Sequence, residues 1–341
     1  MKTIAINGFG RIGRLLFRQL LNEKSIKIVA INDLGDIENL VYLVKYDTIY
    51  GKLQTPVKAT KDAFLVGGNK VAIFQEKNPA KLPWKKLGVD VVIEATGVFD
   101  SYEKAKVHIQ EAGAKRVVIT APSKDKDSDL GKTILMGVNE EQLSTCQISS
   151  NGSCTTNAAS PIMQILSETP GIKKAVLSTT HGYTASQSLV DGPSKGRDVR
   201  RGRAAAQNIV LTTTGAASTV ARALPEFQGK FDGLALRVPV ISGSVADITF
   251  LAKRRTTVEE INKILEKAAA LPRWEGILKV TRDPIVSSDI IKEPYGAIVD
   301  LNFTKVVDGD LVKVLSWYDN EWGYVATLVQ HVIAAAKTVK K

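Results

Sequence analysis

The chain has 341 residues, of which 44% are hydrophobic and 24% are charged. This length exceeds that of one typical domain and indicates two, with enough apolar residues for a large buried core. The sequence contains neither a long polar tract nor an apolar run of about 18 residues. We therefore expect neither a disordered region nor a membrane-spanning helix.

The net charge of +11 favours anionic partners, either phosphorylated metabolites or nucleic acid. The basic residues are spread along the chain, and we recognise no nucleic-acid-binding motif, so we expect a solvated basic surface without a dedicated nucleic-acid site. Two cysteines, Cys146 and Cys154, are too few for a secreted disulfide framework. The first residues, MKTIAINGFG, begin a predicted strand rather than a signal peptide, so we expect a cytoplasmic protein.

The first half of the chain alternates predicted strands with helical segments. A helix is predicted over residues 11–21, and apolar, β-branched strands are predicted over 3–7, 26–32, 89–95 and 116–120. Near-continuous apolar strands separated by helices are typical of a parallel sheet that is covered on both faces. The first half is therefore predicted to be an α/β domain.

The pattern changes near residue 150. Helices are predicted over 155–167 and 322–339, and strands over 173–180, 234–240, 245–252, 297–303 and 311–317. Because fewer helices separate these strands, we expect an α+β domain with a mixed or antiparallel sheet. Residues 182–203 lack periodicity and are rich in Lys and Arg, and a loop of this length is usually functional.

A glycine pattern follows the first predicted strand. Residues 7–14 read NGFGRIGR, which places Gly8, Gly10 and Gly13 between that strand and a helix. Such glycines permit a tight turn and let the backbone approach a pyrophosphate, which the helix N-terminus attracts. Asp33 ends the second strand about 20 residues later, where a carboxylate binds ribose hydroxyls and repels a 2′-phosphate. The pattern predicts a Rossmann-type domain that binds NAD in preference to NADP.

Cys154 lies where a glycine-containing turn meets a predicted helix, in SSNGSCTTNAASP, with Ser153 as the expected N-cap. The helix dipole and the free N–H groups would stabilise a thiolate here and lower its pKa. The same N–H groups can hold a developing oxyanion. We therefore predict that Cys154 is a nucleophile, whereas Cys146 lies in a strand-like context and is predicted to be structural.

His181 is the candidate base for this thiol. It follows an apolar strand at its C-terminal end, so one helix–strand unit can bring it to Cys154. Spacing alone leaves a coincidental histidine as an equal alternative. His108 lies in a helical segment and His331 in the last helix, and both are predicted to be surface or packing residues.

A dinucleotide site together with a thiol nucleophile indicates aldehyde oxidation. The thiolate would add to an aldehyde to give a thiohemiacetal, and His181 would take a proton while hydride leaves for the nicotinamide. The resulting thioester would then be cleaved by water, phosphate or another acceptor.

Seven ordered motifs resemble those of phosphorylating glyceraldehyde-3-phosphate dehydrogenases: NGFGRIGR (7–14), NDL (32–34), SCTTN (153–157), HGYT (181–184), TTTGAA (212–217), RVPV (237–240) and WYDNEWGY (317–324). The resemblance covers essentially the whole chain, and SCTTN and WYDNEWGY are its most specific parts. It implies a homotetramer whose subunits have a cofactor domain at 1–153, with the helix at 320–341 packing back onto it, and a catalytic domain at 154–319. It also assigns Cys154 as the nucleophile and His181 as the base.

The resemblance implies that the enzyme uses NAD, glyceraldehyde 3-phosphate and inorganic phosphate, with no metal site. The residues implied to bind the dinucleotide are Gly8, Gly10, Arg11, Ile12, Gly13, Asp33, Lys77, Thr120 and Asn320, of which Lys77 replaces a common arginine. The residues implied to hold the substrate's phosphate are Thr184, Arg237 and Arg200, with Arg201 or Arg203 as alternatives to Arg200. Those implied to hold inorganic phosphate are Ser153, Thr155, Thr214 and Gly215.

Three segments depart from the family pattern. Ala158 stands where a second cysteine is common, and residues 239–247 (PVISGSVAD) differ from the usual version. Residues 123–132 are longer and more charged than usual, and we expect them to form an exposed loop. Two other functions remain open at this point. An erythrose-4-phosphate dehydrogenase would release its acid by hydrolysis, and a basic chain could chiefly bind RNA.

Overall fold

The computed structural model describes residues 1–194, 196 and 198–339, and it divides into two compact units. Unit 1 comprises Met1–Gly152 and Leu328–Lys341, and unit 2 comprises Ser153–Thr327. The second division falls inside the last helix, so unit 1 contains only the later part of that helix. Among the described residues, no helix combines the length and the apolar character that crossing a bilayer requires.

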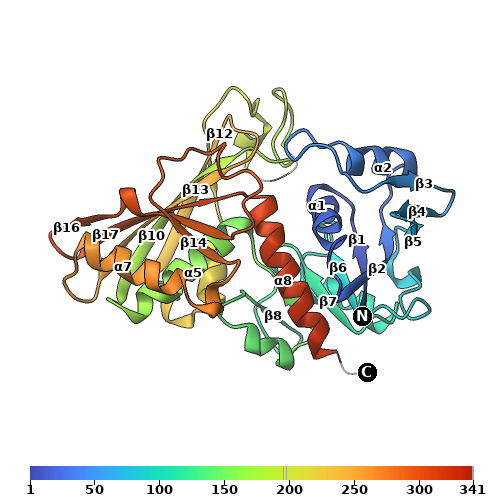
Figure 1. Ribbon diagram of the computed structural model, residues 1–341, viewed down its shortest axis with the longest axis horizontal. Helices are drawn as coiled ribbons and strands as arrows, with labels where there is room; N and C mark the ends of the chain where they lie inside the picture. The colour runs from blue at the N-terminus through green and yellow to red at the C-terminus, as the bar shows by residue number, and fades with distance from the viewer. Residues whose placement is uncertain (195, 197, 340–341) are drawn as a thin grey trace. The chain divides into compact units, whose positions relative to one another are not determined.

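Unit 1 is an α/β unit (Figure 1). Its elements before the last helix are β1 (Lys2–Asn7), α1 (Arg11–Leu20), β2 (Ile26–Asn32), α2 (Ile37–Lys45), β3 (Val57–Ala59), β4 (Ala63–Val66), β5 (Asn69–Phe74), η1 (Pro79–Lys81), β6 (Val91–Glu94), α3 (Tyr102–Ala105), α4 (Val107–Gln110), β7 (Arg116–Ile119), β8 (Gly131–Thr133), η2 (Glu140–Thr145) and β9 (Ile148–Ser150).

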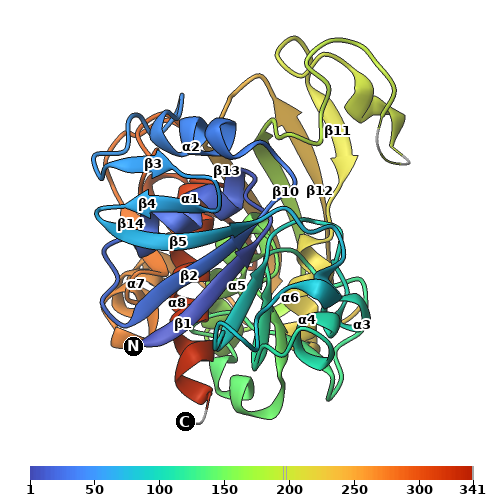
Figure 2. The same cartoon turned by 90° about the vertical axis from the view of Figure 1, so that its right-hand side faces the viewer.

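The strands of unit 1 form one sheet in the order β3-β4-β5-β2-β1-β6-β7-β9-β8. From β5 to β8 every neighbouring pair is parallel, which confirms the predicted parallel sheet, and Figure 2 shows β5, β2 and β1 side by side. The antiparallel edge strands β3 and β4 were not predicted, because strands this short have no clear alternation. Strand β1 pairs with β2 on one side and β6 on the other, so the order of strands reverses at β1. Ligands of such sheets bind at this reversal, beyond the carboxyl ends of the strands.

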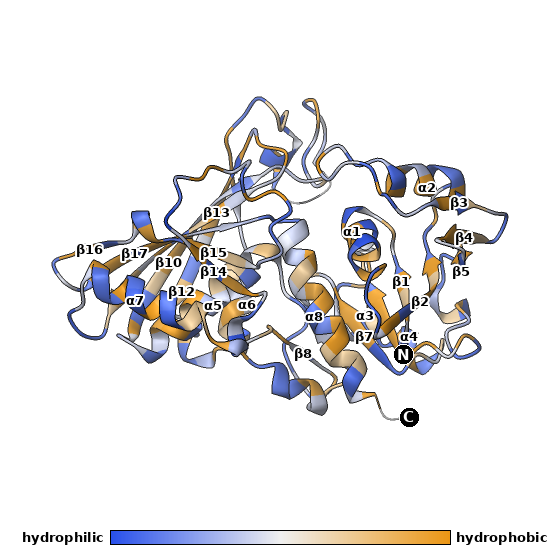
Figure 3. Ribbon diagram, viewed as in Figure 1, coloured by the Kyte–Doolittle hydropathy of each residue, from blue (hydrophilic) through white to orange (hydrophobic). Residues whose placement is uncertain are grey.

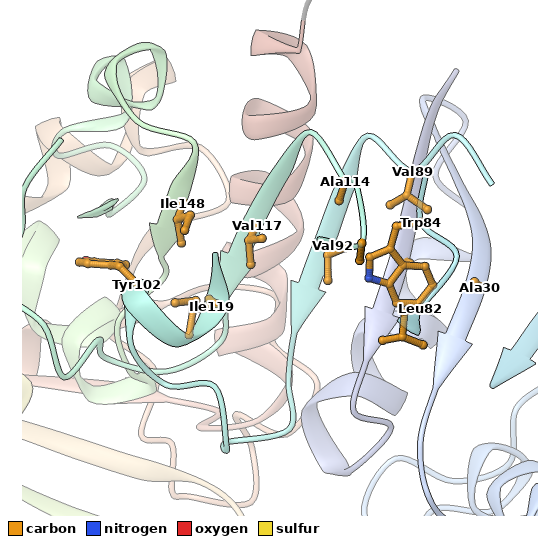
Figure 4. Close-up of a cluster of buried hydrophobic side chains, with 13 residues drawn as sticks. Ala30, Leu82, Trp84, Val89, Val92, Tyr102, Ala114, Val117, Ile119 and Ile148 are labelled. Carbon is orange, nitrogen blue, oxygen red and sulfur yellow. The ribbon is translucent and has the colours of Figure 1, made fainter. Parts of the chain in front are cut away.

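Apolar side chains from strands and loops together form the core of unit 1. In one cluster Trp84 packs with Leu82 and Val89, while Tyr102 and Ile148 lie at its other end (Figure 4). All five side chains are buried. The cluster joins β6, β7 and β9 to the loop before β6, which fixes the strand ends from which the ligand cavity is built.

Unit 2 contains the elements α5 (Cys154–Glu168), β10 (Ile172–Gly182), η3 (Val199–Gly202), β11 (Val210–Thr213), α6 (Ala216–Ala223), η4 (Pro225–Phe227), β12 (Phe231–Val238), β13 (Ser244–Ala252), α7 (Val258–Ala269), η5 (Pro272–Trp274), β14 (Leu278–Thr281), β15 (Ala297–Asp300), η6 (Leu301–Phe303), β16 (Lys305–Val307), β17 (Leu311–Tyr318) and the start of α8 (Trp322–Thr338).

The sheet of unit 2 is mixed, as the sequence predicted. Its order is β11-β12-β10-β13-β17-β15-β14, with β16 paired to β17. Strands β10 and β12 are parallel, and β10 is antiparallel to β13, which is antiparallel to β17. This arrangement places the carboxyl ends of β10, β12 and β17 at the same edge of the sheet, although they are far apart in the sequence.

Two predictions about strands are wrong, one on the length of a strand and one on the location of Cys146. Residues 297–303 do not form one strand, because β15 ends at Asp300, whose carboxylate accepts a hydrogen bond from Asn302 N (3.1 Å) and starts the turn η6. Cys146 does not lie in a strand but between η2 and β9. It is buried, as expected of a structural thiol.

The charged segment 123–132 is only partly the exposed loop that we expected. Gly131 begins β8 and Ser123 is buried. The Asp127 carboxylate accepts hydrogen bonds from Tyr102 Oη (2.8 Å) and Thr133 N (2.8 Å), which ties the segment to the core.

The last helix, α8, is apolar along one stripe and is drawn mainly in the apolar colours in Figure 3. Its buried residues recur at helical spacing, and His331 is fully buried among them. His331 Nδ1 lies 2.9 Å from Asn151 Oδ1, and its Nε2 lies 2.8 Å from Ser149 Oγ. Because the amide oxygen can only accept, His331 carries a proton on Nδ1. Burial, with a smaller contribution from the charge of Arg116, lowers the pKa of His331 to about 3.

His331 should therefore make folding pH-dependent. Unfolded histidine has a pKa of about 6.5, so the unfolded chain binds the additional proton as the pH falls from about 6.5 towards 3. The free energy of unfolding is expected to be unaffected by His331 above this range and to fall by about 1.4 kcal/mol per pH unit within it. Urea unfolding between pH 7 and pH 4.5 would test this. H331Q should reduce the wild-type slope by about this amount, and an unchanged slope would contradict the account.

Candidate active site

A cavity of about 530 Å³ lies at the strand reversal of unit 1. It is bounded by residues at the carboxyl ends of β1, β2 and β6 and in the segments that follow β2, β5 and β6. The lining residues are Asn7, Gly8, Gly10, Asn32, Asp33, Leu34, Glu76, Lys77, Pro79, Ala95, Thr96, Val98 and Phe99. This position is the one at which doubly wound sheets bind dinucleotides.

The three glycines of the NGFGRIGR motif have different surroundings. Gly8 has φ +95°, and a Cβ there would lie 2.5 Å from Thr96 N, so the turn requires glycine. A Cβ on Gly13 would lie 2.2 Å from Gly8 O, so α1 could not pack this closely on the turn. A Cβ on Gly10 would meet no atom within 4 Å, and Gly10 borders the cavity. Gly8 and Gly13 therefore shape the turn, whereas Gly10 keeps the backbone open to a ligand.

Asp33 is held in a fixed orientation at the cavity wall. Its Oδ2 accepts a hydrogen bond from Phe9 N (2.7 Å) and its Oδ1 accepts one from Gly35 N (2.8 Å). A carboxylate oxygen can accept more than one hydrogen bond, so Asp33 retains acceptor capacity for ribose hydroxyls. Its charge is suited to a ribose without a 2′-phosphate.

The other residues predicted to bind the cofactor differ in whether they border the cavity. Lys77 borders the cavity, whereas Thr120 follows β7 and donates through Oγ1 to Glu94 O (3.1 Å). The Arg11 guanidinium pairs with Asp47. Arg11 and Ile12 lie in the first turn of α1, where backbone N–H groups have no intrahelical acceptor. These two residues can therefore meet a pyrophosphate through their backbone.

Asn320 belongs to unit 2, where it follows β17. Its Oδ1 accepts hydrogen bonds from Gly243 N (3.1 Å) and Ser244 Oγ (2.9 Å). These bonds fix the orientation of the amide and use its oxygen. The N–H donors of Nδ2 are then suited to an acceptor such as a carboxamide oxygen.

A buried polar network behind the cavity was not predicted from the sequence. Glu94 ends β6, and its carboxylate accepts hydrogen bonds from Asn7 Nδ2 (2.6 Å) and Thr96 N (2.8 Å). His108 Nε2 lies 3.1 Å from the same carboxylate, and His108 Nδ1 accepts from Trp84 Nε1 (3.1 Å). Polar residues at the ends of otherwise apolar strands could have indicated this network, which fixes the loop that contacts Gly8.

Cys154 is the first residue of α5, at the position that the sequence predicted. The N-cap Ser153 accepts a hydrogen bond from Thr156 N at its Oγ (3.1 Å), which satisfies one N–H group of the first turn. The Cys154 thiol is partly exposed. A thiol in this position faces the unpaired N–H groups of the helix end, which can stabilise negative charge on a bound reactant.

His181 lies near the end of β10, with Nε2 3.4 Å from Cys154 Sγ. Its side chain is buried, and its ring meets the Tyr318 ring edge to face at 5.9 Å between centroids. In the parallel register of β10 and β12, His181 lies opposite Arg237. The pairing of thiol and imidazole, which spacing could not decide, is therefore a direct contact in the structure.

The other nitrogen of His181 has two different neighbours. Nδ1 lies 2.6 Å from Gly182 O and 2.6 Å from Arg237 Nη1. A proton on Nδ1 would be donated to the carbonyl and would leave Nε2 free to accept the thiol proton. A proton on Nε2 would instead face the sulfur, and Nδ1 would then accept from Arg237. Once Nε2 has accepted the thiol proton, both ring nitrogens carry a proton, so Nδ1 still donates to Gly182 O while the Nε2 proton faces the sulfur.

The protonation states correct one expectation. Burial, followed by the charge of Arg237, lowers the pKa of His181 to about 3. Burial raises the pKa of the Cys154 thiol above its usual value, and the charge of Arg237 only partly opposes this. The expected lowering of the thiol pKa is therefore wrong, because burial outweighs the charge of Arg237 and the hydrogen bonds at the helix start. The resting pair is a neutral thiol beside a neutral imidazole.

The arginines of the long loop are placed differently from one another. Arg200 is exposed and pairs with Asp198, and Arg203 pairs with Asp191. Arg201 donates through Nη1 to Ser186 Oγ (3.1 Å), and Ser186 Oγ lies 3.0 Å from Thr184 Oγ1.

The charge of Arg201 also lowers the pKa values of His181 and Arg237, so these groups lie within electrostatic range of it. Thr184, Arg201 and Arg237 therefore form one anion-attracting region.

The residues expected at a second anion site lie at helix starts. Ser153 caps α5 and Thr155 lies in its first turn, while Gly215 is the N-cap of α6. Thr214 Oγ1 accepts a hydrogen bond from Ala216 N (3.2 Å). The Thr155 hydroxyl is bonded to Tyr318 Oη (2.9 Å), a contact that the sequence did not indicate.

Known proteins resemble this chain over nearly its whole length. Residues 2–102 match the family model described as glyceraldehyde 3-phosphate dehydrogenase, NAD binding domain, and residues 153–320 match that of the C-terminal domain. The chain is 48% identical to a glyceraldehyde-3-phosphate dehydrogenase of Streptomyces coelicolor over 96% of each chain. It is 45% identical to that of Clostridium pasteurianum over 100% of each chain. The chain belongs to the glyceraldehyde-3-phosphate dehydrogenase family.

Proposed function

We propose that this enzyme converts glyceraldehyde 3-phosphate, NAD and inorganic phosphate to 1,3-bisphosphoglycerate and NADH, a step of glycolysis or gluconeogenesis. The proposal rests chiefly on the 3.4 Å contact between Cys154 Sγ and His181 Nε2 at the start of α5. A buried base beside a partly exposed thiol is suited to covalent catalysis on an aldehyde.

In the proposed reaction, Sγ of Cys154 attacks the aldehyde carbon while Nε2 of His181 accepts the thiol proton. The N–H groups at the start of α5 stabilise the oxyanion of the resulting thiohemiacetal. NAD, when bound, supplies the hydride acceptor that turns this adduct into a thioester. Inorganic phosphate then attacks the thioester carbon, the C–S bond breaks, and the leaving Cys154 sulfur takes back the proton that His181 Nε2 held.

The cavity of unit 1 fits the dinucleotide in its glycines and its carboxylate. Gly10 and the first-turn N–H groups of Arg11 and Ile12 would meet the pyrophosphate, and Asp33 would bind the adenosine ribose. Lys77 borders the same cavity. Thr120 and Asn320 are proposed from the family resemblance, Thr120 on the adenine side and Asn320 for the nicotinamide carboxamide.

For the substrate's own phosphate we propose Thr184 and Arg237, with Arg201 in place of Arg200. The contact of Arg201 with Ser186, next to Thr184, supports this choice, whereas Arg200 is held by Asp198.

For inorganic phosphate we propose Ser153, Thr214, Gly215 and the backbone N–H of Thr155. The backbone is chosen for Thr155 because its hydroxyl is occupied by Tyr318.

We also propose that the enzyme is a cytoplasmic homotetramer. Four apolar residues in and beside the long loop are each at least 69% exposed, which would suit their burial against another subunit: Leu189, Val190, Val199 and Ile209. Both cysteines are free thiols, which is compatible with the reducing cytosol.

Dependence on phosphate tests the proposed reaction. NADH formation from glyceraldehyde 3-phosphate should stop after about one turnover without inorganic phosphate and continue when it is added, because only phosphate discharges the thioester. C154A should lose about 10⁴-fold or more of the activity. Equal steady rates with and without phosphate would indicate hydrolysis, as in an erythrose-4-phosphate dehydrogenase.

Two substitutions in one motif test the cofactor site. G13A should lower the free energy of unfolding by about 1–3 kcal/mol, because its Cβ would overlap the Gly8 carbonyl. G10A should fold within about 1 kcal/mol of the wild type but bind NAD at least about tenfold more weakly, because its Cβ would enter the ligand's space. Calorimetric titration with NAD and urea unfolding measure the two effects. Unaltered NAD affinity in G10A would argue against this position for the pyrophosphate.

A matched pair of variants tests the reassigned arginine. R201A should lower kcat/KM for glyceraldehyde 3-phosphate by about tenfold or more, because it removes a charge-assisted hydrogen bond to the substrate's phosphate. R200A should remain within about twofold of wild type, in line with an exposed surface pair. R201K controls for loss of charge and should retain part of the activity. A larger loss in R200A than in R201A would restore the original assignment.

A further inference from the structure

Three hydroxyl groups form a hydrogen-bonded chain that leads away from Cys154. Thr155 Oγ1 lies 2.9 Å from Tyr318 Oη, which lies 2.7 Å from Thr179 Oγ1. Thr179 Oγ1 in turn lies 3.2 Å from the carbonyl oxygen of Val245. Each of the three side chains is at least 96% buried, so water does not compete for these bonds.

The direction of the protons along this chain follows from counting donors. A carbonyl oxygen only accepts, so Thr179 donates its one proton to Val245 O. Thr179 must then accept from Tyr318, and Tyr318, having given its own proton away, must accept from Thr155. The Thr155 hydroxyl proton is therefore directed towards Tyr318.

If the hydroxyl groups donated in the reverse direction, the chain would contain a weaker hydrogen bond. Thr179 would donate to Tyr318 and Tyr318 to Thr155, so Thr155 could donate only towards Cys154 Sγ, at 4.0 Å. The Val245 carbonyl would lose the hydroxyl that lies 3.2 Å from it. An oxygen–oxygen contact of 3.2 Å is a better hydrogen bond than an oxygen–sulfur contact of 4.0 Å, so the first direction is favoured.

We propose that Tyr318 is a positioning residue that keeps the Thr155 hydroxyl proton away from the Cys154 sulfur. A hydrogen bond donated to a thiolate stabilises it, which lowers its pKa and also its nucleophilicity. By accepting the Thr155 proton, Tyr318 keeps the thiolate basic and reactive towards a carbonyl carbon. The benefit to catalysis rests on the proposed role of Cys154, whereas the effect on the thiol itself does not.

The groups around the sulfur allow this effect to be isolated. Cys154 is faced by His181 from β10, by the Arg237 charge from β12 and by Tyr318 from β17, with Thr155 on its own helix. Arg201 acts on His181 and Arg237 rather than directly on the thiol. Replacing Tyr318 by Phe preserves the ring that meets His181, so the base should keep its place and only the hydroxyl chain should change.

The test is the pH dependence of iodoacetamide alkylation at Cys154. In Y318F the freed Thr155 hydroxyl should turn to the thiolate and move the midpoint of the rate profile down by about one pH unit. The high-pH rate plateau should fall about threefold, because a less basic thiolate attacks more slowly. A residue with a merely structural role would not move both quantities in this way.

Further variants keep the test decisive. Y318F/T155V should return the midpoint to within a few tenths of a unit of wild type, because no hydroxyl remains to reach the sulfur. T179V removes the acceptor of the Tyr318 proton and should shift the midpoint downwards, whereas T179S restores it. If Y318F fails to fold, as judged by circular dichroism, the T179V and T179S pair decides.

The proposal is overturned if the midpoint in Y318F or T179V is unchanged or rises. The alkylation assay requires neither substrate nor NAD. A failure of the dehydrogenase activity would therefore be recorded separately from a failure of the hydroxyl chain.

Discussion

The proposed chemistry of this enzyme depends on a buried imidazole in direct contact with a partly buried thiol. Cys154 comes from the start of α5, His181 from the end of β10 and Arg237 from the adjacent strand β12. Removing these groups from water disfavours every charge that no partner balances, so the resting pair is neutral. In the proposed reaction the thiol proton moves to His181 as the new bond to carbon forms, and Arg237 would stabilise the charge that develops.

This arrangement explains why the surrounding scaffold is polar where a core would ordinarily be apolar. Gly182 O and Arg237 give His181 an acceptor and a donor for its second nitrogen, and the Tyr318 ring holds the imidazole in place. Unit 1 uses the same principle behind its cavity, where the Glu94 carboxylate is satisfied by buried donors that fix the loop around Gly8. In both units, hydrogen-bonded buried polar groups set the geometry of a site.

Much of this was accessible from the sequence, because local chemistry determines it. The glycine turn, Asp33 after the second strand and Ser153 as the cap before Cys154 are features of short segments with strong backbone preferences. The pKa of Cys154 was not predictable, since it depends on burial by strands far away in the chain. Spacing in the sequence also could not decide which arginine of the long loop binds the substrate's phosphate. That choice depends on the ion pair between Arg200 and Asp198, which only the structure shows. The short antiparallel strands β3 and β4 were not predictable either, because they are too short to show an alternation of apolar and polar residues.

The most direct test of this account is to trap the covalent intermediate. Enzyme mixed with NAD and glyceraldehyde 3-phosphate in the absence of inorganic phosphate, quenched in acid and digested, should carry an acyl group on the peptide that contains Cys154. Adding phosphate before the quench should remove the acyl group and release an acyl phosphate. An unmodified Cys154 peptide under conditions of NADH formation, or an acyl group found on Cys146 instead, would contradict the account.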